Sequence, residues 1–167
     1  YIIDNPTSYL SETAFFDAAN FYFKNGKYSY ALKWYNRVSE EDVSKHQKNM
    51  YNFNKAYSLF VSKRYSDAKK YFQKVQNDQD YKENTNYYLG FIAYQLENFE
   101  EANKNFDKLN RDNDKNITGY FRANMNFKLG RFEEAIRLSI ESLDGSDEKE
   151  ESELSKIIGE SYFNLED

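Results

Sequence analysis

The residue types that most often catalyse reactions or bind metals are sparse in this sequence. There is no cysteine and one histidine, His46, which excludes disulfides, thiol nucleophiles and nearly all zinc chemistry. Residues 112–116 begin like a calcium-binding loop, with Asp, Asp and Asn at alternate positions. Such a loop needs glycine at its sixth place and a bidentate glutamate at its twelfth, where this chain has Ile117 and Ala123. We therefore interpret these residues as a polar turn and expect no metal site, no cofactor and no enzymatic activity.

Acidic residues are abundant, but their placement indicates a solvated surface rather than an acid–base pair. They gather in predicted linkers and on predicted outer faces, as at Glu100, Glu101, Glu133 and Glu134. The net charge of −5 argues against a dedicated nucleic-acid binder, which is usually basic. No apolar run approaches the roughly 18 residues that a membrane span needs. We expect neither nucleic-acid binding nor direct membrane insertion.

Aromatic and small residues, by contrast, recur in one frame along the chain. The sequence has 16 Tyr and 14 Phe but only 6 Gly and 1 Pro, and so few helix breakers favour an all-α fold. In each copy of the frame, one small residue precedes another by twelve positions, and an aromatic lies three positions before the second. The four pairs are Ala19/Ala31, Ala56/Ala68, Gly90/Ala102 and Ala123/Ala135, with aromatics Tyr28, Tyr65, Phe99 and Phe132. The second small residues are 37, 34 and 33 positions apart, and such a period is typical of helical repeats.

Each copy of the frame predicts two antiparallel helices that cross closely where the small residues face each other. The predicted pairs are 9–24 with 28–39, 45–61 with 65–76, 82–95 with 99–109, and 116–128 with 132–143. Residues 1–8 resemble the tail of a preceding helix that ends at Asn5-Pro6. An acidic linker is expected over 144–153, followed by a ninth helix in which Ile158-Gly159 matches Leu89-Gly90.

The frame resembles the tetratricopeptide repeat (TPR), and the unit containing Leu89-Gly90, Phe99, Ala102 and Phe106 matches it best. The resemblance implies a right-handed superhelical solenoid of antiparallel helix hairpins, with about four full repeats and an extra helix. The implied array covers 1–167, with repeats at 12–44, 49–80, 83–115 and 116–148 and the extra helix at 152–165. We expect it to be a piece of a longer solenoid. A looser likeness to tandem-TPR proteins of the bacterial envelope favours a periplasmic or envelope-associated protein, with the cytoplasm as the alternative.

In the TPR family, the first helix of each hairpin lines a concave groove. The positions that face it lie three residues before, and one, four and five residues after, the first small residue. The first three positions supply the binding candidates Phe16, Asn20, Phe23, Phe53, Tyr57, Phe60, Tyr87, Phe91, Tyr94, Tyr120, Asn124 and Phe127. The last position holds Lys24, Val61, Gln95 and Lys128. Two interpretations of the aromatic rows stay open: they contact a partner, or they pack between successive first helices.

The function implied by the resemblance is a non-catalytic scaffold that docks a partner protein or peptide in this groove, since aromatics dominate binding hot spots. Family members that grip a C-terminal carboxylate use a clamp of Lys and Asn residues. Asn20 and Asn124 match the Asn place of that clamp. Phe16 and Tyr120 occupy its Lys place and cannot pair with a carboxylate, so we do not expect this clamp. The alternatives are a self-assembly module that forms homo-oligomers and a helical domain that binds a soluble ligand.

Overall fold

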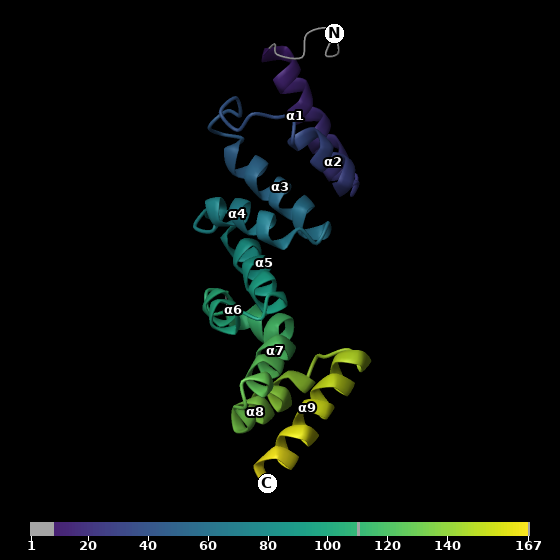
Figure 1. The fold of residues 1–167 in the computed structure, drawn as a ribbon, viewed down its shortest axis with the longest axis vertical. Coiled ribbons are helices and arrows are strands. Elements are labelled where there is room, and N and C mark those ends of the chain that lie inside the picture. Colours follow the sequence, from purple (N-terminus) through teal and green to yellow (C-terminus); the bar gives the residue numbers. More distant parts are fainter. Residues whose placement is uncertain (1–8, 110, 167) are drawn as a thin grey trace. The chain divides into compact units, whose positions relative to one another are not determined.

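The computed structural model describes residues 9–109 and 111–166, with side chains over 13–109 and 118–166. Over these residues the protein is all-α, as predicted, with nine helices and no strand (Figure 1). The predicted helix tail at 1–8 lies outside the described residues. The helices are α1 (Tyr9–Lys24), α2 (Tyr28–Tyr35), α3 (Lys48–Val61), α4 (Tyr65–Val75), α5 (Lys82–Gln95), α6 (Phe99–Phe106), α7 (Arg111–Lys128), α8 (Phe132–Leu143) and α9 (Glu148–Glu166).

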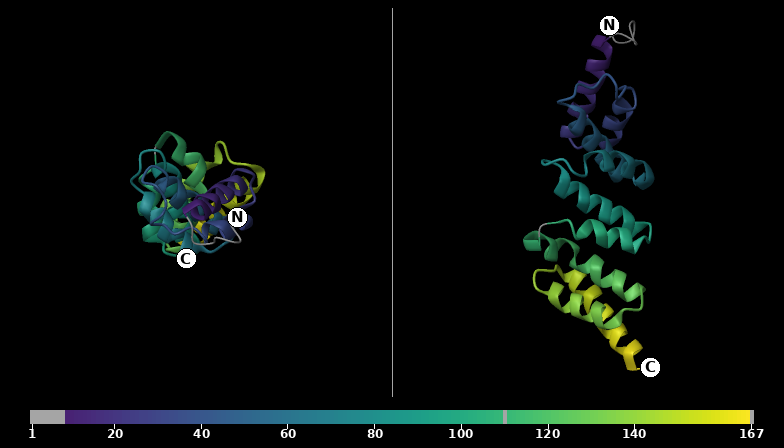
Figure 2. Two further views of the ribbon diagram at one scale, coloured as in Figure 1. Left: turned by 90° about the horizontal axis from the view of Figure 1, so that it is seen from above. Right: turned by 90° about the vertical axis from the view of Figure 1, so that its left-hand side faces the viewer.

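The chain divides into two compact units, Tyr1–Leu89 and Gly90–Asp167, with the boundary inside α5. In the first unit α1 packs on α2, α2 also contacts α3, and α3 packs on α4. In the second unit α7 packs on α8, and α9 covers both of them (Figures 1 and 2). Most of these contacts join helices that follow one another in sequence, as in a chain folded into successive hairpins.

The predicted small residues lie at the helix contacts. Seven of them have no exposed surface: Ala19, Ala31, Ala56, Ala68, Ala102, Ala123 and Ala135. The eighth, Gly90, is buried against Phe106, and a Cβ atom there would collide with the Phe106 ring. Small side chains are needed at these positions because the partner helix approaches so closely.

The turn inside each hairpin contains one residue with left-handed backbone, always five positions before the second small residue. These residues are Gly26 (φ 69°), Lys63 (φ 57°), Glu97 (φ 57°) and Gly130 (φ 70°). A positive φ ends the first helix and reverses the chain, which glycine does without steric cost. The predicted turn over 96–98 is confirmed, and there the Asn98 side chain accepts a hydrogen bond from the Glu101 backbone N–H.

Several predicted helix ends were wrong by a few residues. α2 ends at Tyr35 rather than 39, and α6 ends at Phe106 rather than 109. In both, the chain tightens into a short turn, with hydrogen bonds from Val38 N–H to the Tyr35 carbonyl and from Leu109 N–H to the Phe106 carbonyl. α3 begins at Lys48, three residues later than predicted, because the preceding segment forms turns instead.

Two helices begin earlier than predicted. α7 begins at Arg111, so the residues that we interpreted as a polar turn are helical. α9 begins at Glu148, so only the first part of the predicted acidic linker is a linker. There the Asp147 carboxylate accepts a hydrogen bond from the Glu150 backbone N–H, 2.9 Å away, and caps the helix. Negatively charged side chains in the first turn interact favourably with the positive end of the helix dipole. The acidic residues that we predicted as a solvated linker therefore start a helix.

Candidate binding surface on the first helices

The twelve candidate residues lie on α1, α3, α5 and α7, which are the first helices of the hairpins. Phe16 is buried, with 5% of its surface exposed. The other eleven are half-buried. Each of these side chains therefore lies partly in the protein interior and partly at the surface of its helix. Within each unit we call this surface of the first helices the first-helix face.

In the first unit, aromatic candidates contact one another across successive helices. Tyr57 of α3 lies 5.8 Å from Phe23 of α1 and 5.3 Å from Tyr88 of α5, measured between ring centres. Phe60 lies 4.9 Å and Phe53 6.4 Å from the same Tyr88 ring. These rings therefore pack between neighbouring first helices, as one of the two interpretations expected.

In the second unit, the ring of Phe121 on α7 takes the corresponding role. Phe91 and Tyr94 of α5 lie 5.5 Å and 5.0 Å from it, and the adjacent Tyr120 lies 5.6 Å from it. Phe127 contacts Phe132 at 5.9 Å. Two ring candidates of the first unit remain: Tyr87 contacts the adjacent Tyr88 at 5.4 Å, and Phe16 contacts Tyr51 of α3 at 6.3 Å.

Sequence reasoning missed Tyr88 and Phe121, on which these clusters centre. Both lie two residues before the first small residue of their hairpin, so this spacing was the signal that could have found them.

The two asparagine candidates are hydrogen-bonded within the protein. The Tyr35 hydroxyl donates to Asn20 Oδ1 at 2.6 Å, and the Asn54 amide donates to the same oxygen at 3.3 Å. The Tyr94 hydroxyl donates to Asn124 Oδ1 at 3.2 Å. Each asparagine thus ties its own first helix to another helix of its unit.

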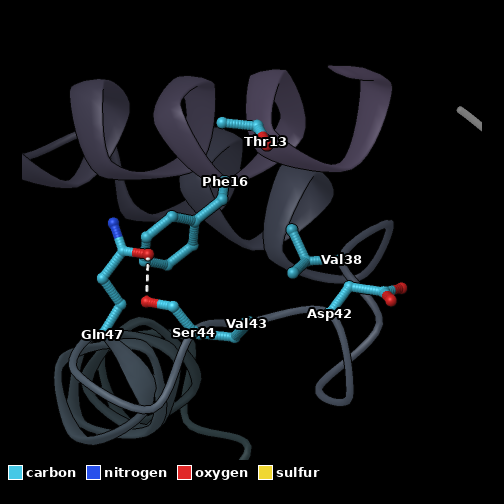
Figure 3. A pocket seen from close by; sticks show the side chains of 7 residues that line it. All are labelled: Thr13, Phe16, Val38, Asp42, Val43, Ser44 and Gln47. Atoms are coloured by element: carbon cyan, nitrogen blue, oxygen red, sulfur yellow. Dashed lines mark hydrogen bonds between the residues drawn. The ribbon is translucent and has the colours of Figure 1, made fainter. Parts of the chain in front are cut away.

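A cavity of about 70 Å³ adjoins the first-helix face in the first unit. Thr13 and Phe16 of α1 form one side, and the segment between α2 and α3 forms the other (Figure 3). In that segment the Ser44 hydroxyl donates to Gln47 Oε1 at 2.7 Å. The cavity has room for a few water molecules or the end of one side chain.

A larger groove, of about 450 Å³, adjoins the same face in the second unit. Its aromatic side comes from Tyr120 and Phe121 of α7, and its polar side comes from the start of α9. The polar lining residues are Asp147, Lys149, Glu150 and Glu153. We call this feature the acidic groove, because three carboxylates and only one ammonium group are among its lining side chains.

The cavity and the acidic groove occupy equivalent positions in their hairpins. Phe16 and Tyr120 each lie three residues before the first small residue. In the helix that follows, the first small residue is Ala56 in α3 and Gly159 in α9. Nine positions before it stand Gln47 and Glu150, and twelve positions before it stand Ser44 and Asp147. The recess in the first unit is therefore small and lined by one carboxylate, Asp42, whereas the recess in the second unit is wide and lined by three.

The first unit also contains a filled version of this recess. Phe53 corresponds to Phe16 and Tyr120, and Tyr81 corresponds to Gln47 and Glu150. The Tyr81 ring lies 4.8 Å from the Phe53 ring, tilted by 30°. A planar side chain of the protein itself therefore occupies this position.

The carboxylates of the acidic groove act on the tyrosines beside it. Burial raises the pKa of Tyr120, and the Glu153 and Glu150 carboxylates raise it further. Burial raises the pKa of Tyr94 to about 12, with Tyr120 and Glu153 adding to the effect. Both hydroxyls therefore remain protonated at neutral pH and act as hydrogen-bonding groups.

The described part of the chain contains no group of three or more His, Asp or Glu side chains placed to hold a metal ion. Among the described helices, none is long and apolar enough to cross a membrane. In comparisons with known proteins, no protein-family model matches the chain, and no curated protein is significantly similar to it.

Proposed function

We propose that this protein is a non-catalytic scaffold of TPR-like hairpins that docks a partner protein or peptide on its first-helix face. The observation that carries the proposal is the recurrence of a recess at one position of this face. The recess adjoins Phe16 and Tyr120, two residues expected to contact a partner. Open recesses beside aromatic rings provide places where a partner's side chains could insert.

Two features support the TPR-like arrangement. The small residues of each pair are buried where the helices of a hairpin cross. The left-handed residue recurs five positions before the second small residue in all four hairpins. Regular spacing of both features supports a chain of similar hairpins, as expected for a repeat protein.

The aromatic rings that bridge the first helices would support docking indirectly. They fill the space between helices and hold the recesses in shape, so the partner meets a surface that is already ordered. Such preorganisation lowers the entropy cost of binding. We therefore assign recognition to the recesses rather than to the ring clusters around Tyr88 and Phe121.

Self-assembly is a second candidate, and exposed apolar residues on α9 favour it. Tyr162 and Phe163 are 53% and 66% exposed, and Leu165 is also exposed. An apolar helix face of this kind commonly packs against another helix. A soluble small ligand fits less well, because such sites contain few charged residues, whereas four of the six residues that line the acidic groove are charged.

Site-specific photo-crosslinking tests which face docks the partner. Benzoylphenylalanine would replace Lys24, Gln95 or Lys128, which are exposed near the ends of first helices. Matched controls would carry it at Glu100 or Glu133, which are exposed on second helices. After irradiation in an extract of the native cell, we expect one crosslinked partner from the first-helix positions and none from the controls.

Equal crosslinking from both sets, or crosslinking from the second-helix positions alone, would remove the proposal. A product with twice the mass of the chain would identify self-assembly instead.

A further inference from the structure

We propose that the acidic groove binds an arginine side chain of an extended partner segment, with its guanidinium stacked on Tyr120 and paired with Glu150 and Glu153. This inference rests on the proposed function, because the groove belongs to the first-helix face. It goes further because it names the chemical group of the partner that binds in one of the recesses.

The filled recess in the first unit shows what kind of group fits this position. There, the planar ring of Tyr81 stacks on Phe53 at 4.8 Å and 30°. In the acidic groove the equivalent of Phe53 is again an aromatic ring, Tyr120, whereas the equivalent of Tyr81 is Glu150. The groove therefore keeps the aromatic surface and lacks the planar group that covers it.

Because the groove is negatively charged, it favours a cationic group over the Tyr120 ring. Asp147, Glu150 and Glu153 line it together with a single Lys149. One Asp147 oxygen is engaged at the start of α9 by the Glu150 backbone N–H. Within the described part of the chain, the side chains of Glu150 and Glu153 have neither a hydrogen bond nor an ion pair, so both can accept from a ligand. Both carboxylates line the groove together with Tyr120, and after burial they add to the rise in the pKa of its hydroxyl.

Arginine meets both requirements better than lysine. Its guanidinium is planar, stacks on aromatic faces, and donates in a fork that suits carboxylates, whereas the ammonium of lysine is a compact, strongly hydrated charge. The volume of about 450 Å³ also exceeds what a guanidinium needs, so the flanking backbone of an extended segment can enter with it.

A pair of peptides that differ only in charge tests this proposal. The ¹⁵N-labelled chain would be titrated with Ac-Gly-Ala-Arg-Ala-Gly-amide and with its citrulline analogue, which has nearly the same shape but no charge. We expect saturable shifts of the Tyr120, Phe121, Glu150 and Glu153 amide signals with the arginine peptide. The citrulline peptide should bind at least about tenfold more weakly, since it lacks the charge-assisted hydrogen bonds.

Two double variants separate the groove from the general charge of α9. Glu150→Gln with Glu153→Gln removes two negative charges inside the groove, and we expect the Kd for the arginine peptide to rise about tenfold or more. Glu148→Gln with Glu151→Gln removes two charges from the same helix outside the groove and should change Kd by less than about twofold. All four glutamates lie at the start of one solvated helix, so the fold should tolerate either variant.

Glu150→Tyr gives an independent test, because it copies the Tyr81 arrangement into the groove. The new ring should cover Tyr120 and abolish binding of the arginine peptide while the melting temperature stays the same or rises.

Three results would overturn the proposal: no saturable shift up to about 20 mM arginine peptide, equal binding of the two peptides, or equal weakening by the two double variants. Any of them would leave the proposed function standing if photo-crosslinking still marks the first-helix face. Loss of that crosslinking would remove the proposed function itself.

Discussion

At the scale of single residues, the two asparagine candidates are part of the hydrogen-bond network that joins neighbouring helices. Asn20 Oδ1 accepts from the buried Tyr35 hydroxyl and from the Asn54 amide. We expect Asn20→Ala to lower the free energy of unfolding by about 1–2 kcal/mol, because a buried hydroxyl then loses its acceptor. Urea unfolding would measure the change, with the exposed Asn164→Ala as a control that should cost less than about 0.5 kcal/mol. An equal cost in both variants would show that the network contributes nothing to stability.

The left-handed turn residues support a second prediction. Lys63 and Glu97 hold a φ of 57° without being glycine, whereas Gly130 occupies the equivalent place with a φ of 70°. Since a side chain in this region strains the backbone, Lys63→Gly and Glu97→Gly should each raise the free energy of unfolding by about 0.5–1 kcal/mol. Gly130→Ala should lower it by about 1 kcal/mol for the same reason. Thermal unfolding of the three variants would measure these changes in stability. A destabilising Lys63→Gly would mean that the contacts of the Lys63 side chain outweigh the backbone strain.

At the scale of helices, two glycines in equivalent positions should respond in opposite ways to the same substitution. Gly90 in α5 lies against the Phe106 ring, with which an added Cβ would collide. Gly159 in α9 has no atom within 4 Å of an added Cβ. We expect Gly90→Ala to lower the free energy of unfolding by about 1–3 kcal/mol through overpacking. Gly159→Ala should raise it by about 0.5–1 kcal/mol, since alanine is the better helix former.

Chemical denaturation of both glycine variants measures this contrast. If both substitutions stabilised the protein, the close packing of α5 against α6 would be in doubt. If both destabilised it, another element would have to cover α9.

At the scale of the whole molecule, buried phenols and one buried ammonium make the free energy of unfolding decrease at alkaline pH. Burial raises the pKa of Tyr88 and of Tyr94 from 10.0 to about 12, and it also raises that of Tyr35. For Lys55, burial lowers the pKa, but hydrogen bonds with Tyr51 and Tyr71 outweigh it, and the pKa is raised overall. The unfolded chain therefore releases these protons at a lower pH than the folded one.

The free energy of unfolding should accordingly stay constant up to about pH 9 and fall steadily above pH 10, because protonated forms favour the folded state. Absorbance at 295 nm would follow tyrosine ionisation while circular dichroism follows the helices. We expect a group of tyrosines that ionise only as the helices unfold, near pH 12. Ionisation of all sixteen near pH 10 with the helices intact would contradict this expectation.

The amino-acid sequence by itself determined most of the helices and their pairing. Local periodicity and the small-residue frame predicted α1, α5 and α8 with their observed bounds, because apolar spacing and turn residues act within a few positions. The ends of α2, α6, α7 and α9 could not be predicted, since short turns, caps and helix-start charges compete with continued helix at nearly equal free energy. The acidic run before Glu153 is an example, because its charges suit a solvated linker and a helix start equally well.

Only the tertiary structure decided which recesses on the first-helix face are filled. Phe53 and Tyr120 hold the same place in the repeat, and nothing near either residue in sequence distinguishes a covered ring from one beside an open groove. The difference comes from the start of the helix that follows, where equivalent positions hold Tyr81 in the first unit and Glu150 in the second. The Tyr81 ring packs on Phe53 and covers it, whereas the Glu150 side chain lines a groove that stays open beside Tyr120. This outcome depends on contacts between one hairpin and the helix that follows it, so a pattern confined to one hairpin does not predict it.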